Sequence, residues 1–463
     1  MGPLDVSAAE VARATGGTLL SGAGEQRISG VTIDSRQVKP GDMFVALKGE
    51  RVDGHQFIPE AVARGAVAVL LEREIFPPGT VALLKVPDCR EALLDLAAWH
   101  RRRFSLVTVG ITGSTGKTTT KEMVAAVLAQ SFSVHKNRGN YNTEIGVPLT
   151  LFELEPDHEI AVLEMGMRGR EQIRRLAQVA APKIGVITNI GLTHLELLGT
   201  VENIARAKWE LVEELPPAGV AVLNGDDERL RQLSRSFKGR VFFYGLGVEN
   251  DFRAVEMESR KDGSISFTAC TPAGEGRIQL PLPGRHNVVN ALAALAAGAA
   301  LGMSLPEMAR GLAAMEPAAM RLNIVKNKAG VTIINDAYNA NPTSMESGLL
   351  TLMDLKGEGR AVAVLGDMLE LGPAASKAHW EVGEKAARLG LDLLVALGEW
   401  RETVLAGARE GGLPGEKTRA FSDKDEAAAF LKDWLQAGDL VLVKASRGLQ
   451  LEDIVAELLD QGD

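Results

Sequence analysis

The chain has 463 residues, of which 46% are hydrophobic and 5% aromatic, and its formal net charge is −9. The length suggests about three domains, and the hydrophobic content is that of a globular protein rather than a disordered one. The acidic charge argues against nucleic acid or an anionic membrane surface as a partner, because both reward a basic surface.

The sequence carries no signal for secretion or for a membrane span. The N-terminal residues lack a basic start followed by an apolar core, so they do not form a signal peptide. The Ala-rich run Ala291–Leu301 is too short to cross a bilayer. We therefore expect a soluble, cytoplasmic monomer without membrane insertion. Cys89 and Cys270 lack metal-binding spacing and are predicted to be unpaired, buried thiols.

Residues 1–104 are predicted to form a small α/β domain. Short β-rich runs alternate with helical patterns, in the order VTIDS, MFVALKG, FIPEAVARG, AVAVLLE and VALLKV. A helix is expected from Arg90 to Phe104, and it ends in the basic cluster His100–Arg103. We interpret this cluster as a solvated helix end that suits the helix dipole, not as a binding site.

Residues 105–314 are predicted to form a doubly wound, mostly parallel sheet. Continuous apolar strands alternate with helical stretches, which is typical of parallel strands that are buried on both faces. The strands are LVTVGIT, EIAVLEMG, KIGVITNI and GVAVLNG. A β-rich stretch from Val241 to Leu282 interrupts this pattern, and a helix from Asn287 to Leu301 closes the domain.

Residues 315–463 are predicted to form a third, Rossmann-like α/β domain. Helical stretches again separate apolar strands, here VTIINDAY, AVAVLGDM, DLLVALG and DLVLVKAS. Gly and Pro residues mark the joins between elements. The predicted fold is therefore an α/β protein of three domains.

The strongest chemical signal is the Gly-rich run GITGSTGKTTT at residues 110–120, between an apolar strand and a helix. Backbone N–H groups in such a turn cradle phosphates, and the helix N-terminus adds partial positive charge. Ile111 stands where a strict Walker A motif has its first glycine, so a chance Gly-rich turn is the alternative. A triphosphate bound here suits a kinase, an ATPase, a GTPase or a ligase. The candidate phosphate-binding residues are Gly110, Thr112, Gly113, Ser114, Thr115, Gly116, Lys117, Thr118 (also a Mg²⁺ ligand) and Thr119.

Polar side chains follow three other strands of the central domain. Glu164 ends one strand, where a carboxylate can hold Mg²⁺, and His194 follows another. Ligands of open α/β sheets bind beyond the carboxyl ends of the strands. A capping Asn, a surface Glu and a His bonded to backbone are the structural alternatives, but convergence on one end of the sheet favours a site. A polar loop after the second strand adds Asn140, Asn142 and Thr143.

Six phrases across essentially the whole chain resemble the Mur ligase family: GITGSTGKTTT, EMGM, TNIGLTHLE, ARAKWE, GRHNVVNALAA and MRLNIV, in this order. The resemblance implies an ATP- and Mg²⁺-dependent amide ligase. A substrate carboxylate attacks the γ-phosphate of ATP to give an acyl phosphate, from which an amine displaces phosphate. The resemblance also implies that Glu164 and His194 hold a second Mg²⁺. It adds Asn287, Asn290, Arg321 and Asp336 as ATP contacts, with helix capping as the alternative for Asn287.

Lys208 matches the family phrase AxAKxE, and the resemblance implies that it carries a carbamate and serves as a further metal ligand. A neutral lysine amine adds CO₂, and burial favours the neutral form. The alternative is an exposed lysine paired with Glu202 or Glu214 on the same helix.

The N-terminal phrase TIDSRQVKPGDMFVALKGERVDGHQFI resembles the domain with which the two later ligases of the family bind the UDP-muramoyl substrate. The resemblance places Ser35, Arg36 and the Gly49–His55 loop, with Asp53 and His55, near the uridine diphosphate. A β-hairpin rich in turn residues is the alternative.

The C-terminal phrases INDAYNANPTSM and AVLGDMLELG resemble the family member that adds D-alanyl-D-alanine, and the Asp-Asn-Pro-Arg motif of the diaminopimelate-adding member is absent. The implied substrates are UDP-N-acetylmuramoyl-tripeptide and D-alanyl-D-alanine, in peptidoglycan synthesis. Asn339 and Asn341 read the peptide or form a turn. Lys444, Ser446 and Arg447 hold a dipeptide carboxylate or cap the last helix.

Two alternatives stay open at this point. The first is another ligase of the family, which adds a single amino acid or acts like a folylpolyglutamate synthetase. The second is a nucleotide-binding scaffold that keeps the fold without turnover, against which the presence of Lys117, Glu164 and His194 argues.

Overall fold

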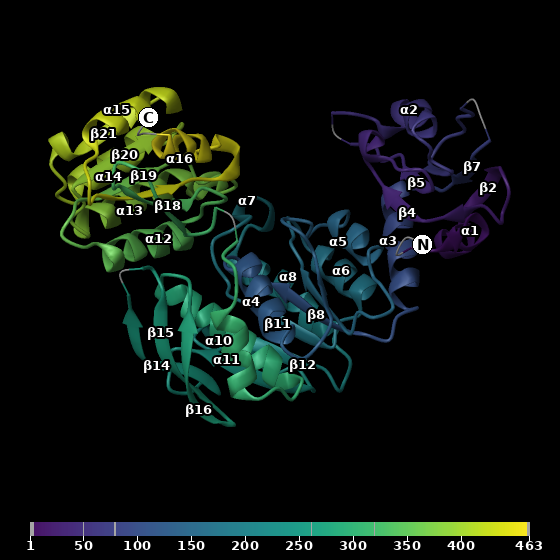
Figure 1. Cartoon of the computed structure of the whole chain (residues 1–463), viewed down its shortest axis with the longest axis horizontal. Coiled ribbons are helices and arrows are strands. Elements are labelled where there is room, and N and C mark those ends of the chain that lie inside the picture. The colour runs from purple at the N-terminus through teal and green to yellow at the C-terminus, as the bar shows by residue number, and fades with distance from the viewer. Residues whose placement is uncertain (1–3, 50, 78–79, 261, 319, 461–463) are drawn as a thin grey trace.

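The computed structural model describes residues 4–49, 51–77, 80–260, 262–318 and 320–460. Its sheets lie in three regions that form an arc, with the N-terminal and C-terminal regions at the two ends (Figure 1). The strands of each region are mostly parallel and alternate with helices. The predicted α/β fold of three units is confirmed.

The N-terminal region contains, among its described residues, a five-stranded sheet in the order β2-β7-β6-β5-β4 and a separate β1–β3 pair. Helix α1 begins after Ser7, whose hydroxyl accepts from the Glu10 N–H at 3.2 Å in a reciprocal capping box. The elements are β1 Val6–Ser7, α1 Ala8–Thr15, β2 Thr18–Ser21, β3 Arg27–Ile28, β4 Gly30–Thr32, η1 Ser35–Gln37, β5 Asp42–Val45, η2 Gly54–Phe57, α2 Ile58–Ala63, β6 Ala68–Leu71, β7 Ala82–Lys85 and α3 Cys89–Arg101.

Helix α3 joins the N-terminal and middle regions through one apolar core, whose residues come from both regions and range from Leu4 to Leu230. At its end His100 and Arg101 are buried, and the Arg101 guanidinium donates to Thr108 Oγ1 at 3.1 Å. The prediction of a solvated basic helix end is therefore wrong for these two residues. The reason is that the helix runs into the neighbouring region instead of ending in solvent.

The middle region forms, over the part that the structure describes, a nine-stranded sheet in the order β16-β15-β14-β13-β12-β11-β8-β10-β9. The β-rich stretch 241–282 does not interrupt this sheet as expected: β13 pairs parallel to β12, and β14–β16 extend the sheet, with antiparallel β14–β15 and β15–β16 pairs. The elements are β8 Val107–Thr112, α4 Lys117–Leu128, β9 Val134–Lys136, α5 Gly146–Leu151, β10 Ile160–Glu164, α6 Gln172–Ala180, β11 Ile184–Ile187, α7 Leu195–Leu198, α8 Val201–Glu213, β12 Val220–Asn224, α9 Glu228–Ser234, β13 Arg240–Gly245, β14 Phe252–Ser259, β15 Ile265–Thr271, β16 Gly274–Leu280, α10 Arg285–Ala300 and α11 Leu305–Ala313.

The C-terminal region forms, within its described part, a six-stranded sheet in the order β17-β18-β22-β19-β20-β21, in which only the β17–β18 pair is antiparallel. Its apolar core is separate from that of the other two regions. The elements are β17 Asn323–Lys326, β18 Thr332–Asp336, α12 Pro342–Leu355, β19 Ala361–Leu365, η3 Gly372–Ala374, α13 Ala375–Arg388, β20 Leu393–Leu397, α14 Arg401–Glu410, η4 Gly415–Lys417, β21 Thr418–Phe421, α15 Lys424–Trp434, β22 Leu440–Lys444, η5 Arg447–Leu449 and α16 Glu452–Leu459.

Two composition-based predictions can be compared directly with the structure. Cys89 and Cys270 are both free and buried, as predicted. Among the residues with described coordinates, no helix combines the length and apolar character needed to cross a membrane.

Candidate active site

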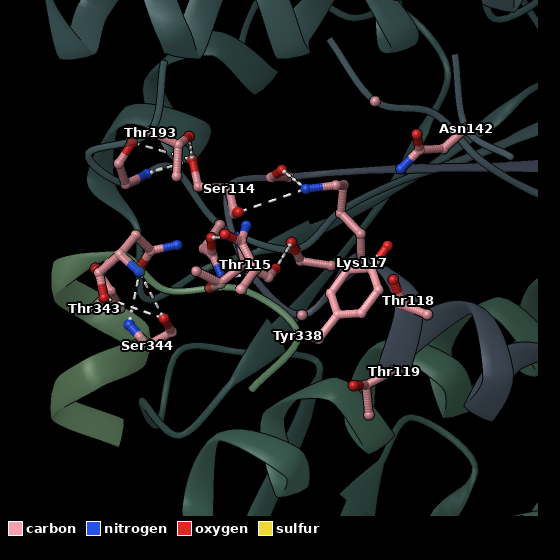
Figure 2. A pocket seen from close by; sticks show the side chains of 18 of the residues that line it. Ser114, Thr115, Lys117, Thr118, Thr119, Asn142, Thr193, Tyr338, Thr343 and Ser344 are labelled. Carbon is pink, nitrogen blue, oxygen red and sulfur yellow. Dashed lines mark hydrogen bonds between the residues drawn. The ribbon is translucent and has the colours of Figure 1, made fainter. Parts of the chain in front are cut away.

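A cavity of about 980 Å³ lies where the carboxyl ends of the middle and C-terminal sheets meet. Figure 2 shows Lys117 and Thr118 of the middle region beside Tyr338 of the C-terminal region in this cavity. Strand ends of both sheets thus contribute to one site, as expected for open α/β sheets. The predicted site residues that line it are Gly113, Ser114, Thr115, Gly116, Lys117, Thr118, Thr119, Asn140, Asn142, Thr143, Glu164, His194, Lys208, Asn287, Asn290, Arg321, Asp336, Asn339, Asn341, Lys444, Ser446 and Arg447.

The Gly-rich loop requires glycine at two positions that lie against neighbouring side chains. Gly113 has φ of 152°, and a Cβ there would lie 1.8 Å from Thr188 Oγ1. Gly116 has φ of 76° and precedes α4, so it supplies the left-handed conformation that turns the loop into the helix. Gly110 and Thr112 are predicted site residues that do not line the cavity: Gly110 lies within strand β8, and Thr112 is the buried last residue of that strand.

Asn189 fixes the Gly-rich loop from the end of the neighbouring strand. Its backbone carbonyl accepts from the Ser114 N–H at 3.0 Å, and its Oδ1 accepts from the Thr115 N–H at 2.9 Å. Its Nδ2 donates to Thr115 Oγ1 at 2.7 Å. The sequence analysis missed this residue, although its position two residues after β11 is the same kind of strand-end signal that identified Glu164.

Glu164 is the last residue of β10, and its carboxylate is buried against the first turn of α4. The Thr118 hydroxyl donates to Oε2 at 2.8 Å, and Asn142 Nδ2 donates to Oε1 at 2.7 Å. A buried carboxylate beside a hydroxyl is the hard oxygen donor set that Mg²⁺ prefers. Their arrangement at the first turn of α4 therefore fits the metal that accompanies a bound triphosphate.

His194 lies in the left-handed conformation (φ 54°) immediately before α7. Its Nδ1 lies 2.7 Å from Oε2 of Glu370, a residue of the C-terminal region. Glu370 also lines the cavity, as do Tyr338 and His286, and the sequence analysis identified none of these three. Their positions depend on how the two regions meet, which no local pattern encodes.

Lys208 lies on α8 and is 1% exposed. Burial lowers the pKa of its amine well below the usual range, and the nearby charge of Lys117 adds to this effect. The alternative of an exposed lysine paired on its own helix is wrong. Glu202 lies 3.7 Å from Arg229, and Glu214 lies 2.9 Å from Arg174.

The C-terminal candidates form a connected polar group. The Lys444 ammonium donates to Asp336 Oδ2 at 2.6 Å and to the Asn339 carbonyl at 3.0 Å. The Arg321 guanidinium stacks over the Tyr338 ring, 4.2 Å from its centroid. Asn341 caps α12, because its Oδ1 accepts from the Ser344 N–H at 2.9 Å. Its side chain therefore has a turn-forming role, whichever ligand the cavity binds.

Four more candidates at the cavity have partners within the protein. Ser446 Oγ accepts from the Leu369 N–H at 3.0 Å, and the half-exposed Arg447 pairs with Glu452. Asn287 is the third residue of α10 rather than its cap, since Gly284 occupies the cap position. Asn290 Nδ2 donates to Asn287 Oδ1 at 3.1 Å.

The N-terminal candidates do not reach this cavity. Ser35 is buried and donates to Glu60, and the exposed Arg36 guanidinium pairs with Asp34 at 2.9 Å. His55 is also buried: Nδ1 lies 2.7 Å from Asp53 Oδ1 while Nε2 accepts from the Glu72 N–H at 3.0 Å. Of the Gly49–His55 loop, residue 50 lies outside the described residues. Ser35 and His55 thus hold the domain together, and Arg36 is left accessible.

Family models match the chain in three consecutive parts. The description "Mur ligase family, catalytic domain" matches residues 27–101 and "Mur ligase middle domain" matches residues 111–298. The description "Mur ligase, glutamate ligase domain" matches residues 320–447.

Similar proteins cover nearly the full length. The chain is 38% identical to a UDP-N-acetylmuramoyl-tripeptide–D-alanyl-D-alanine ligase of Bacillus subtilis, over 97% of both chains. A crystal structure of MurF from Acinetobacter baumannii matches with a TM-score of 0.91 and 35% identity, over 99% of both chains. MurF from Thermotoga maritima in complex with ADP matches with a TM-score of 0.83 and 31% identity, over 93% of this chain and 97% of that one. On this full-length similarity, together with a cavity built from its motifs, the chain belongs to the Mur ligase family.

Proposed function

We propose that this protein is an ATP-dependent ligase that joins D-alanyl-D-alanine to UDP-N-acetylmuramoyl-tripeptide in peptidoglycan synthesis. The observation that carries the proposal is that the Gly-rich loop, Glu164 and the buried Lys208 line one cavity, in a chain similar over its full length to ligases of that name. The C-terminal side of the cavity, with Asn339, is where the incoming dipeptide is expected to bind.

The reaction has two steps. The terminal carboxylate of the tripeptide attacks the γ-phosphorus of ATP, the bond to ADP breaks, and an acyl phosphate forms. The amine of D-alanyl-D-alanine then attacks the acyl carbon, loses a proton, and phosphate leaves. Phosphoryl transfer depends mainly on positioning and charge neutralisation. Lys117 and Arg321 supply positive charge for this. Burial lowers the pKa of Lys117, the nearby charge of Glu164 opposes this effect, and the charge of Arg321 adds to it.

Thr118, Glu164 and His194 are the residues that would hold Mg²⁺. When bound, Mg²⁺ would neutralise negative charge on the phosphate oxygens. The hydrogen bonds from Thr118 and Asn142 fix both oxygens of Glu164, so the carboxylate is oriented before a ligand arrives. His194 would contribute Nε2, since its Nδ1 faces Glu370.

Lys208 is proposed to be carbamylated. The neutral amine nitrogen attacks the carbon of CO₂, forms an N–C bond and releases one proton, which leaves an anionic group with two oxygens. Burial favours the neutral amine that this reaction requires. No hydrogen bond or ion pair occupies the Lys208 ammonium in the described part of the chain. The amine is therefore available for the modification.

The proposed domains are residues 1–104 for the nucleotide sugar, 105–314 for ATP and 315–463 for the dipeptide. The N-terminal candidates Ser35, Arg36, Asp53 and His55 lie away from the cavity. This separation suits a long substrate whose uridine diphosphate is bound far from its reacting carboxylate. Among the four, Arg36 is the side chain accessible to a diphosphate.

The test is to incubate the protein with UDP-N-acetylmuramoyl-tripeptide, ATP, Mg²⁺ and D-alanyl-D-alanine, and to look for the pentapeptide by mass. Single amino acids and a folate substrate, each assayed by phosphate release, test the other ligase functions. Lys117→Ala is the inactive control, because loss of one preorganised charge contact costs on the order of 10²–10³ in rate. Exposed Lys377→Ala is the matched control with full activity. Absence of product with the tripeptide, with turnover of another pair, would overturn the proposal.

A further inference from the structure

Strand β9 ends before its neighbour β10 does. Residues Ile160–Val162 of β10 pair with β9, whereas the pairing of β10 with β8 continues to Glu164. At Glu164 one side of the backbone therefore faces no strand. An unpaired buried N–H or C=O costs free energy comparable to a lost hydrogen bond, so this position needs another partner.

The Asn137 side chain takes the place of the missing strand. The Glu164 N–H donates to Asn137 Oδ1 at 2.9 Å, and Asn137 Nδ2 donates to the Glu164 carbonyl at 3.0 Å. A carboxamide thus makes the two hydrogen bonds that the next residue pair of a ladder would make. Asn137 is 0% exposed, so solvent cannot replace it.

The same side chain also holds the polar loop on the substrate side of the cavity. Asn137 Nδ2 donates to the Tyr141 carbonyl at 2.8 Å. The next residue, Asn142, donates from Nδ2 to Glu164 Oε1 at 2.7 Å, and its carbonyl accepts from the Gly166 N–H at 2.7 Å. Asn137 therefore fixes the backbone of Glu164 and, through the loop, the residue that orients the Glu164 carboxylate.

Lys121 connects Asn137 to α4, the helix that follows the Gly-rich loop. It lies one helical turn after Lys117 on α4, its side chain is 0% exposed, and its ammonium donates to the Asn137 carbonyl at 2.7 Å. Its ammonium also lies 3.0 Å from Glu122 Oε1. A buried ammonium is costly unless it is paired and hydrogen-bonded, so these contacts hold Lys121 in one place.

We infer that Asn137 and Lys121 are positioning residues that set Glu164 and the Asn140–Thr143 loop at a fixed place relative to the Gly-rich loop. Neither residue lines the cavity, so both act through Glu164. The effect on catalysis rests on the proposed ligase function, whereas the effect on the Glu164 backbone does not. An outer partner of a metal-binding residue typically contributes about 10–100-fold in activity or metal affinity.

The test compares Asn137→Ala and Asn137→Asp with Asn327→Ala. The aspartate keeps the shape and one acceptor but loses both donors. Asn327 is the matched control: it is buried in the C-terminal region, accepts from the Val331 N–H at 2.9 Å and donates to the Leu458 carbonyl at 3.0 Å. Two readouts are taken, which are hydrogen–deuterium exchange of the peptide spanning residues 160–166, and kcat and KM as a function of Mg²⁺ concentration.

Both Asn137 variants should show faster hydrogen–deuterium exchange at residues 160–166. Their kcat should fall by about 10–100-fold, and they should need more Mg²⁺ for half-maximal rate. The KM for D-alanyl-D-alanine should change by less than about 3-fold. Asn327→Ala should lower the melting temperature but leave exchange at 160–166 and the Mg²⁺ dependence as in wild type. Lys121→Met, which removes the donor at similar volume, keeps the test decisive if Asn137→Ala does not fold.

Wild-type exchange and wild-type Mg²⁺ dependence in Asn137→Asp and Lys121→Met would overturn the inference. An equal loss of kcat at every Mg²⁺ concentration would also overturn it, because that result indicates general destabilisation. If wild type makes no pentapeptide but exchange still rises in the variants, the positioning role stands and the proposed function fails.

Discussion

Glu370 Oε2 lies 2.7 Å from His194 Nδ1, so a carboxylate of the C-terminal region contacts a candidate metal ligand of the middle region. The other oxygen of Glu370 lies 3.9 Å from Arg168 Nε. Nearby, η3 packs on α7, and a Cβ added to Gly372 would lie 3.2 Å from the Glu196 side chain. The two regions thus meet at the site itself, and the orientation of His194 depends on where the C-terminal region sits.

The first prediction concerns this contact and domain closure. Glu370→Ala should lower kcat by about 10-fold or more, because His194 loses the carboxylate that orients its ring. Small-angle scattering with an ATP analogue and the UDP-substrate should show a smaller radius of gyration in wild type than in the variant, with bending at Ala313–Pro317. Glu381→Ala, an exposed carboxylate on α13, is the control that should leave both measurements unchanged. Equal kcat values for the two variants would contradict this account.

The second prediction is that Lys208→Ala loses most of its ligase activity and that a small added carboxylic acid restores part of it. The acid would place an anionic oxygen ligand where the carbamate stands. Exposed Lys238→Ala is the matched control, and the acid should not raise its rate. The steady-state rate with and without acetate is the measurement. Near wild-type activity of Lys208→Ala would show that the lysine serves only as a buried structural residue.

The third prediction distinguishes dipeptide binding by Asn339 from helix capping by Asn341, on the C-terminal side of the cavity. Asn339→Ala should raise KM for D-alanyl-D-alanine several-fold and leave KM for the UDP-substrate unchanged. Asn341→Ala should in addition lower stability by about 1 kcal/mol, because it removes the cap of α12. Asn341→Ser keeps a capping side chain and tests the amide alone. An equal rise of both KM values in Asn339→Ala would place the amine pocket elsewhere.

The fourth prediction concerns stability against acid. His100 is 1% exposed and packs between Phe104 and Phe152, and no hydrogen bond reaches either ring nitrogen in the described structure. Burial lowers the pKa of His100 to about 4. Between this value and the unfolded value of about 6.5, the unfolded chain binds more protons than the folded one. Stability should therefore fall as the pH drops through this window, by on the order of 3 kcal/mol from His100 alone.

His100→Phe should remove that contribution and keep the aromatic packing. The loss of melting temperature between pH 7.5 and pH 5 should be smaller in the variant than in wild type. His158→Phe, which replaces a half-buried histidine elsewhere in the middle region, is the control. If the melting temperatures of wild type and His100→Phe fall by the same amount between pH 7.5 and pH 5, the buried imidazole is not the titrating group.

Much of the fold could be predicted because the strands of the middle and C-terminal sheets are short apolar runs with polar or glycine residues at or just after their ends, as at Glu164, Asn224 and Asp336. The Gly-rich loop and Glu164 were predictable for a related reason, since strand ends of a parallel sheet meet at one edge. Arg101 was misjudged because its burial depends on another region, not on its own helix. Asn137 was missed because an asparagine after a short edge strand looks like an ordinary turn residue, and only the pairing register shows which backbone it completes.

The shared core beneath α3 has a mechanical consequence. One apolar core contains residues of both the N-terminal and the middle region, from Leu4 to Leu230, whereas the apolar clusters of the C-terminal region are built from its own residues, and Ala313–Pro317 leads into that region. We therefore expect the C-terminal region to move relative to the other two. On the proposed function, the UDP-substrate and the Gly-rich loop would then move together, and the C-terminal region would bring the attacking amine and Glu370 to them.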